Sequence, residues 1–136
     1  TLCVREIMSN RVVTIPENIH LVDIINTLKV NDASYLHMVN KSEELTGIIS
    51  FRDIRPLLQE DTLKHSIMAK DIATSDVFTV RASDNVLLAL ERMGRRGISQ
   101  LPVVAENNDG KVIGTVSKKD VLAAYERIVV HREIEG

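Results

Sequence analysis

The sequence is poor in the residue types that several classes of protein require. It has one cysteine, Cys3, which excludes a disulfide within the chain and a metal site built from several thiolates. It has no tryptophan and only 3% aromatic residues, so stacking platforms for single-stranded nucleic acid are not expected. No apolar run approaches the length of about 18 residues that a membrane-spanning helix needs. No basic-then-apolar start resembles a signal peptide.

An excess of charge of one sign is missing as well. The 17 lysines and arginines nearly balance the 19 aspartates and glutamates, and the formal net charge is −2. The two signs are mixed along the chain, which leaves no basic stripe for nucleic acid and no polybasic membrane anchor. The 44% of hydrophobic residues is typical of a globular domain, and a single cysteine favours a cytoplasmic location. The chain begins at Thr1 without methionine, so we expect a piece of a longer protein.

One short pattern occurs twice. Residues 47–53 read GIISFRD and residues 114–120 read GTVSKKD. Self-similarity extends over both halves of the chain, at an offset of 65 residues that becomes 67 after a longer turn in the second copy. Aligned pairs include Thr14 with Thr79, Asn18 with Ser83, Ser34 with Ser99, Met38 with Val103, Gly47 with Gly114, Ser50 with Ser117 and Asp53 with Asp120.

Both copies show the same order of predicted elements: strand, helix, strand, strand, helix. This order predicts an α/β fold with one repeat over 1–66 and a second over 67–136. Asn18 and Ser83 are the expected N-caps, and Asp109-Gly110 predicts a hairpin turn. The expected strands are 12–15, 35–39 and 45–50, then 77–80, 100–104 and 111–117; the expected helices are 19–31 and 84–96, and one starting near Phe51 and one near Lys118. A repeat of this size buries little surface alone, so we expect the two to pack sheet to sheet about a pseudo-twofold axis.

The serine and aspartate of each signature stand where a strand ends and a helix begins. One interpretation is a capping box, in which the serine accepts from the N3 amide and the aspartate accepts from the N-cap amide. The other is a ligand site, because a helix N-terminus favours an anion and these side chains can hydrogen-bond a polyol such as ribose. Basic residues stand beside both signatures: Arg52 and Arg55, then Lys118 and Lys119. The sequence leaves both interpretations open.

These two repeats, each ending in G-x-x-S-x-x-D, resemble a tandem pair of CBS (cystathionine β-synthase) domains, also called a Bateman module. The resemblance covers residues 4–128 and is closer in the second copy, which reads GISQLPVV and then VIGTVSKKDVL. The first copy departs at His37, where the family usually has the proline that is found here as Pro102. The resemblance implies two β-α-β-β-α repeats, packed through their sheets, that bind adenosine ligands.

The same resemblance implies which residues bind the ligand. Aspartate would hold the ribose hydroxyls, serine and its basic neighbour would meet phosphate, and backbone groups would contact adenine. One site would combine Ala33 and Ser34 with Ser117, Lys119 and Asp120; the other would combine Ile98, Ser99 and Pro102 with Ser50, Arg52 and Asp53. The segments around Met8-Ser9 and around Ile72, Ala73 and Thr74 would border the adenine pockets.

A narrower resemblance concerns the parent protein. The stretches SFRDIRPLL (50–58), MAKDIAT (68–74) and VLAAYERIV (121–129) resemble the cytoplasmic tail of prokaryotic ClC-type chloride channels and transporters. This implies a homodimeric regulatory module, covalently attached to a transmembrane channel domain, that senses AMP, ADP or ATP and requires no cofactor. CBS pairs also occur on metabolic enzymes and magnesium transporters, and a module that only dimerises a larger protein is a further alternative.

Catalytic and metal-binding arrangements are not expected. His20, His37, His65 and His131 lie far apart and lack metal-ligand spacing, so each is expected to be a surface or half-buried residue. Cys3 has no histidine partner that would activate a nucleophile. Asp53 and Asp120 hold the same position in their repeats, whereas a general acid and base need unlike environments. We therefore expect no enzyme activity.

Overall fold

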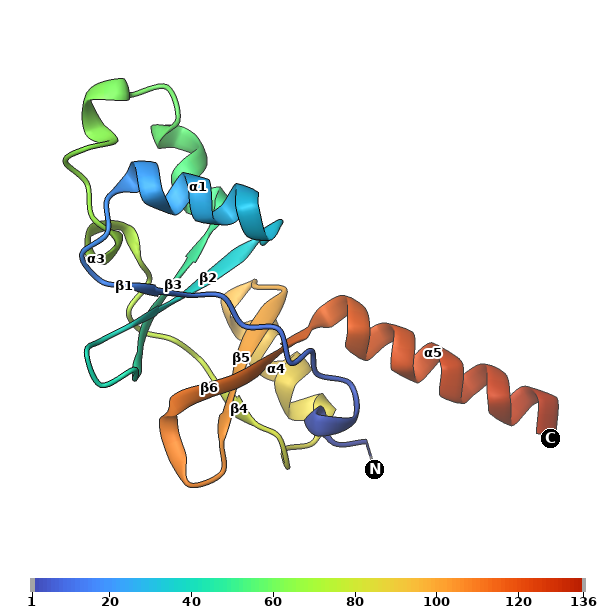
Figure 1. Cartoon of the computed structure of the whole chain (residues 1–136). Coiled ribbons are helices and arrows are strands. Elements are labelled where there is room, and N and C mark those ends of the chain that lie inside the picture. Colours follow the sequence, from blue (N-terminus) through green and yellow to red (C-terminus); the bar gives the residue numbers. More distant parts are fainter. Residues whose placement is uncertain (1, 136) are drawn as a thin grey trace. The chain divides into compact units, whose positions relative to one another are not determined.

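The computed structural model describes residues 2–135. The chain divides into two compact units, one of residues 12–77 and one that combines residues 1–11 with residues 78–136 (Figure 1). They are called the 12–77 unit and the 78–136 unit below. The predicted boundary between the two repeats, between residues 66 and 67, stays a prediction.

The 12–77 unit is a three-stranded sheet with helices on one face. Its strand order is β1-β2-β3, in which β1 runs parallel to β2 and β2 runs antiparallel to β3. A parallel pair needs a crossover, which α1 provides. The elements are β1 (Thr14–Pro16), α1 (Leu21–Asn31), β2 (Tyr35–Val39), β3 (Leu45–Ser50), α2 (Phe51–Ile54) and α3 (Ala69–Ile72), with short 3-10 turns at Arg55–Leu57 and Asp61–Leu63.

The core of this unit forms where α1 packs on the sheet. Leu21, Ile24 and Leu28 follow helical spacing and are buried against Leu36 of β2 and Ile49 of β3. Burying each such side chain contributes about 1.5–3 kcal/mol. Because side chains alternate along a strand, this packing turns the neighbouring residues of β2 and β3 toward the opposite face of the sheet.

The 78–136 unit repeats this plan. Its strand order is β4-β5-β6, again with one parallel and one antiparallel pair. Its elements are a 3-10 turn at Val4–Glu6, β4 (Val80–Arg81), α4 (Val86–Arg96), β5 (Gln100–Ala105), β6 (Asn108–Ser117) and α5 (Lys118–Glu135). Val86, Ala89 and Met93 of α4 are buried against Leu101 and Val116. The predicted α/β fold class and the order of elements in both repeats are confirmed.

The final helix α5 is much longer than its counterpart α2. Arg55-Pro56 ends α2 after one turn, since proline cannot donate the next helical hydrogen bond. Val121 and Ala124 of α5 are buried, whereas Val129, Val130 and Ile134 farther along are 53%, 48% and 79% exposed. Figure 1 shows this helix extending beyond the sheet of its unit. Among residues 2–135, no helix combines the length and the apolar composition that crossing a bilayer requires.

The predicted N-caps are wrong by two residues. Helix α1 is capped by His20 rather than Asn18, and α4 by Asn85 rather than Ser83. The first amides of α1 donate to the carbonyls of Ile67 and Lys64, at 2.8 and 3.1 Å, so this helix needs no capping side chain. The hydroxyl and amide of Ser83 both donate to the Glu106 carboxylate, each at 2.9 Å, which keeps Ser83 outside the helix.

The predicted hairpin turn at Asp109-Gly110 is also wrong. Ala105 pairs with Asn108, so the turn consists of Glu106 and Asn107, and Asp109 and Gly110 belong to β6. The next pair, Val104 with Val112, shows that β6 carries additional residues as a bulge. The Asp109 carboxylate pairs with the Arg81 guanidinium, which connects this part of β6 to β4.

The glycine of each signature allows a backbone segment to approach the last strand of the sheet. Thr74 forms an antiparallel bridge with Ile48 beside Gly47, and Ser9 forms one with Thr115 beside Gly114. A Cβ on Gly114 would lie 2.5 Å from the Ser9 carbonyl oxygen, and a Cβ on Gly47 would lie 3.0 Å from the Ala73 Cβ. The two glycines therefore serve close packing.

We predict that Gly114→Ala lowers the free energy of unfolding by about 1–3 kcal/mol, because the added methyl group forces the Ser9 backbone away from β6. Gly94→Ala is the matched control: nothing lies within 4 Å of a Cβ there, and the residue is in the interior of α4. That change is expected to add about 0.5–1 kcal/mol. Urea unfolding measures both, and equal effects of the two variants would contradict the close approach.

Candidate functional site

The signature of the 12–77 unit folds back on itself. One oxygen of Asp53, Oδ2, accepts the Ser50 amide at 2.8 Å and the Ser50 hydroxyl at 3.1 Å. Asp53 therefore stabilises the turn from β3 into α2, as the capping interpretation predicts. Within the described part of the chain, its second oxygen accepts no hydrogen bond, so half of the carboxylate is available to a ligand.

The signature of the 78–136 unit keeps the serine half of the capping box. Here the Ser117 hydroxyl oxygen accepts the Asp120 amide at 3.1 Å. The Asp120 side chain is exposed, and among residues 2–135 its carboxylate has neither a hydrogen-bond partner nor an ion pair. Two signatures of identical spacing thus differ chemically, because one aspartate caps its own turn while the other is free.

The basic residues beside the signatures differ in the same way. The Arg55 guanidinium lies 5.6 Å from the centre of the Phe51 ring, so it is engaged in a cation–π contact. Arg52, Lys118 and Lys119 are exposed, and the ion pairs found among the described residues do not include them. These three cations can therefore meet an anionic group of a ligand.

The loop before each central strand is tied to the signature of its own unit. The Ser34 carbonyl accepts the Phe51 amide at 3.2 Å, and the Ser99 carbonyl accepts the Lys118 amide at 2.8 Å. These bonds use the first amide of α2 and of α5. Each loop therefore lies beside the serine and aspartate of the same repeat.

A further segment lies beside the last strand of each sheet, around Thr74 in the 12–77 unit and around Ser9 in the 78–136 unit. Thr74 and Ile48 exchange two backbone hydrogen bonds of 2.9 Å, and Ser9 and Thr115 exchange bonds of 2.8 and 2.9 Å. In the 12–77 unit the structure thus brings together Ala33, Ser34, Ser50, Arg52, Asp53, Ile72, Ala73 and Thr74; in the 78–136 unit it brings together Met8, Ser9, Ile98, Ser99, Pro102, Ser117, Lys119 and Asp120. The predicted combination of loop residues of one repeat with the serine and aspartate of the other stays a prediction.

One residue with functional potential was not among the predicted site residues. His37 was expected at or near the surface, but it is only 2% exposed. Neither of its ring nitrogens has a hydrogen-bond partner among the described residues. Burial lowers its pKa from the usual 6.5, and the nearby Val13 carbonyl opposes this only in part. The departure from proline at this position was the signal in the sequence.

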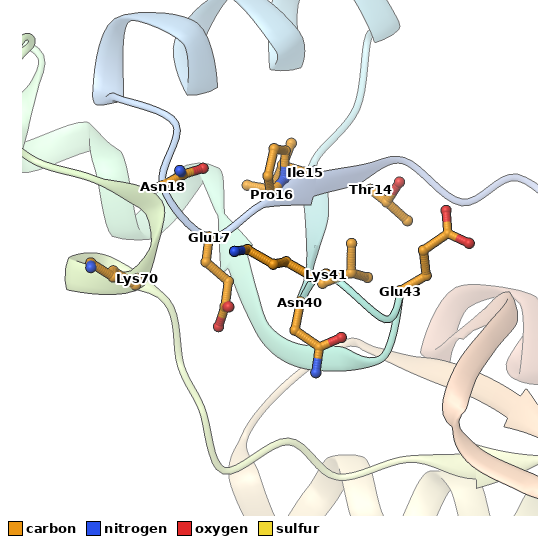
Figure 2. Close-up of a pocket in the computed structure, with 10 residues that line it drawn as sticks. Thr14, Ile15, Pro16, Glu17, Asn18, Asn40, Lys41, Glu43 and Lys70 are labelled. Atoms are coloured by element: carbon orange, nitrogen blue, oxygen red, sulfur yellow. The ribbon is translucent and has the colours of Figure 1, made fainter.

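A cavity of about 420 Å³ lies elsewhere in the 12–77 unit, beside the ends of β1 and β2 (Figure 2). None of the predicted site residues lines it. Figure 2 shows the Lys41 side chain reaching toward Glu17. The carboxylate of Glu17 accepts the Thr46 hydroxyl at 3.1 Å. Because Val39 borders the cavity while Tyr35 pairs with Ser50, cavity and signature lie at opposite ends of β2.

The residues that the structure describes contain no cluster of three histidine, cysteine, aspartate or glutamate side chains that could hold a metal ion. The polar groups at the two signatures are a carboxylate, a hydroxyl and ammonium or guanidinium groups, with backbone carbonyls nearby. This set suits a ligand that carries both hydroxyl groups and a negative charge.

We predict that the two signature aspartates affect stability differently. Asp53→Ala should lower the free energy of unfolding by about 1 kcal/mol, because the cap of Ser50 is lost. Asp120→Ala should change it by less than about 0.5 kcal/mol, because no described residue hydrogen-bonds or pairs with this carboxylate and only its exposed interaction with the first turn of α5 is lost. Urea unfolding of both variants tests the difference, and equal losses would show that the two carboxylates have the same role in the fold.

We further predict that stability decreases as the pH falls below 6.5, the ordinary pKa of histidine. The lowered pKa of His37 means that the unfolded chain binds this proton more readily than the folded chain does, so acid favours unfolding. Its cross-strand neighbours, Thr14 and Ile48, carry no charge that could stabilise the cation. His37→Phe should reduce the loss between about pH 8 and about pH 5, whereas His65→Phe, at an exposed site, should not. An unchanged pH profile in His37→Phe would contradict this assignment.

Comparison with known proteins identifies the two repeats. The family model described as "CBS domain" matches residues 4–60 and again residues 69–127. The CBS domain pair of protein MJ0100, solved in complex with 5′-methylthioadenosine and S-adenosyl-L-methionine, is 25% identical. It superimposes with a TM-score of 0.79 over 92% of this chain and 96% of that one.

Longer proteins contain similar stretches. Inosine-5′-monophosphate dehydrogenase of Methanocaldococcus jannaschii is 29% identical over 131 residues, which is 96% of this chain. The magnesium transporter MgtE of Bacillus subtilis is 28% identical over 120 residues, which is 85% of this chain. The chain spans only 25% of the length of each of these two relatives. With two matched copies in tandem, the chain belongs to the CBS-domain family and is a CBS domain pair, a type of regulatory module.

Proposed function

We propose that this CBS pair senses an adenosine ligand and controls a larger protein to which it is attached. The observation that carries the proposal is the exposed Asp120 carboxylate, which has no partner among the described residues and stands beside the equally unpaired Lys118 and Lys119. A carboxylate accepts hydrogen bonds from both hydroxyls of a ribose, and the ammonium groups attract a charged 5′ substituent. The adenosine compounds bound to the MJ0100 pair support this ligand class.

The site residues make three kinds of contact: to the ribose hydroxyls, to the 5′ group and to adenine. Asp53 and Asp120 hold the ribose hydroxyls. Ser50 and Arg52 in one set, and Ser117 and Lys119 in the other, contact the 5′ group. The backbone of the remaining residues contacts adenine: Ala33, Ser34, Ile72, Ala73 and Thr74, and Ile98, Ser99 and Pro102. The proposed function requires no cofactor and no catalytic residue, since binding alone transmits the signal.

Control follows from linkage. A ligand that binds one arrangement of the module more tightly than another shifts the equilibrium by the difference between the two binding free energies. We propose a homodimeric module on the cytoplasmic side of a membrane protein. Three stretches resemble the tail of ClC-type chloride channels, and the similarity to MgtE supports an ion-transport protein as the attached partner. The similarity to inosine-5′-monophosphate dehydrogenase supports a metabolic enzyme as the alternative partner.

Calorimetry with AMP, ADP, ATP, 5′-methylthioadenosine and S-adenosyl-L-methionine tests the ligand class. We predict that Asp120→Ala weakens binding about 10- to 150-fold, which corresponds to the 1.5–3 kcal/mol of about one hydrogen bond to a charged group. The fold should be unaffected, because no described residue hydrogen-bonds or pairs with this carboxylate. Asp53→Asn should weaken the other site while an amide oxygen still accepts the Ser50 amide.

Two outcomes would contradict the proposal. Absence of heat with every adenosine compound at millimolar concentration would favour a dimerisation scaffold whose signatures act only as helix caps. Full affinity in both aspartate variants would mean that the ligand binds elsewhere in the chain. Lys70→Ala, which alters the cavity at the other end of β2, is the matched control for the second outcome and should leave binding unchanged.

A further inference from the structure

His37 is a buried polar side chain without a partner. It is 2% exposed, and among the described residues nothing hydrogen-bonds either Nδ1 or Nε2. Leaving both nitrogens unsatisfied costs stability, and an apolar side chain of similar size would avoid this cost. The fold itself therefore does not explain why a histidine stands here.

The strand register places His37 in line with the candidate site. Thr14 of β1 pairs with His37, His37 pairs with Ile48 of β3, and Ile48 forms the bridge with Thr74. Directly paired residues project on the same face of a sheet, so these four form one row across it. Ser50 follows Ile48 by two residues and projects on this face too. The hydrophobic cluster around Leu36, Met38 and Ile49 belongs to the opposite face.

The 78–136 unit has an equivalent row of paired residues, and this row contains no histidine. There Pro102 pairs with Thr115, which forms the bridge with Ser9. Proline offers neither a side-chain polar group nor a backbone N–H, whereas the His37 amide donates to the Val13 carbonyl at 2.9 Å. The two repeats therefore present chemically different groups at equivalent places beside their signatures.

We infer that His37 contacts the ligand in the adenosine site that contains Ser50 and Asp53, by hydrogen-bonding the nucleoside part of that ligand. The inference rests on the proposed function and adds a residue to it. Thr74 at the end of the row is exposed, and polar ligand atoms that enter there would give the His37 ring the hydrogen bond that no described residue provides.

The state of the ring indicates which part of the ligand it contacts. Burial favours the neutral imidazole, which has one donor and one acceptor nitrogen. The adenine edge and the ribose hydroxyls offer matching neutral groups. A phosphate would instead favour the protonated ring, which burial opposes. His37 should thus contribute equally to the binding of ligands that share adenosine and differ only at the 5′ position.

The test measures binding of 5′-methylthioadenosine, AMP and ATP to the whole chain by calorimetry. His37→Phe should lower the affinity of one site by about tenfold or more, by the same factor for all three ligands, as expected when a hydrogen bond is lost. His37→Asn should recover part of the affinity, because an amide supplies both a donor and an acceptor. His65→Phe, the same change at an exposed position, should have no effect.

Two further readouts distinguish a ligand contact from a structural role. The thermal midpoint of unliganded His37→Phe should not be lower than that of the original chain, since an unsatisfied group has been removed. On ligand addition, the ¹⁵N resonances of the His37 ring should shift as one nitrogen gains a hydrogen bond. A loss of affinity only for ATP would assign His37 to the phosphate instead and overturn the inference.

Failure of the inference is separable from failure of the proposed function. If the original chain binds adenosine compounds, Asp53→Asn weakens binding and His37→Phe does not, then His37 is no ligand contact and the site remains. If no adenosine compound binds the original chain, the proposed function fails and the assignment of His37 fails with it.

Discussion

Two short backbone bridges determine how this chain forms compact units. Thr74, which precedes the strands of the second repeat, bonds to Ile48 in the sheet of the first, and Ser9, which precedes the strands of the first repeat, bonds to Thr115 in the sheet of the second. Each bridge needs the absence of a side chain on the neighbouring glycine, because a Cβ on Gly114 would meet the Ser9 backbone at 2.5 Å. The bridges bring Thr74 and Ser9 to the sheets whose last strands end in the signature serines.

The same turn chemistry produces two different functional surfaces. At Ser50 the aspartate is partly consumed by the capping box, whereas at Ser117 the serine caps the helix and the Asp120 carboxylate bonds to none of the described residues. Capping and ligand binding are therefore not exclusive interpretations of a G-x-x-S-x-x-D signature. They compete for the same oxygen atoms, and each repeat divides those atoms differently. Beside Asp120 stand Lys118 and Lys119, which form no ion pair with the residues that the structure describes.

A second asymmetry runs along the sheet face beside each signature. Where the second repeat has Pro102, the first has His37, and this exchange affects the backbone as well as the side chain. The His37 amide bonds to Val13, directly before β1, and β1 pairs over three residues, whereas β4 beside Pro102 pairs over two. Pro102 has no N–H, which accounts for the shorter parallel pair of β4 and β5. His37 brings an imidazole, which places an unsatisfied polar group in the first repeat.

Local patterns were sufficient to predict the repeat, the order of the strands and helices, and the starts of α2 and α5 at Phe51 and Lys118. Hydrophobic periodicity and the strand-to-helix serines act over a few residues, so the sequence alone determined them. Tertiary contacts decided the rest. Asn18 and Ser83 are not caps because distant groups, the carbonyls near Ile67 and the Glu106 carboxylate, satisfy the backbone or hold the serine first. The burial of His37 and the free state of Asp120 likewise depend on partners far apart in the chain, which no local pattern contains.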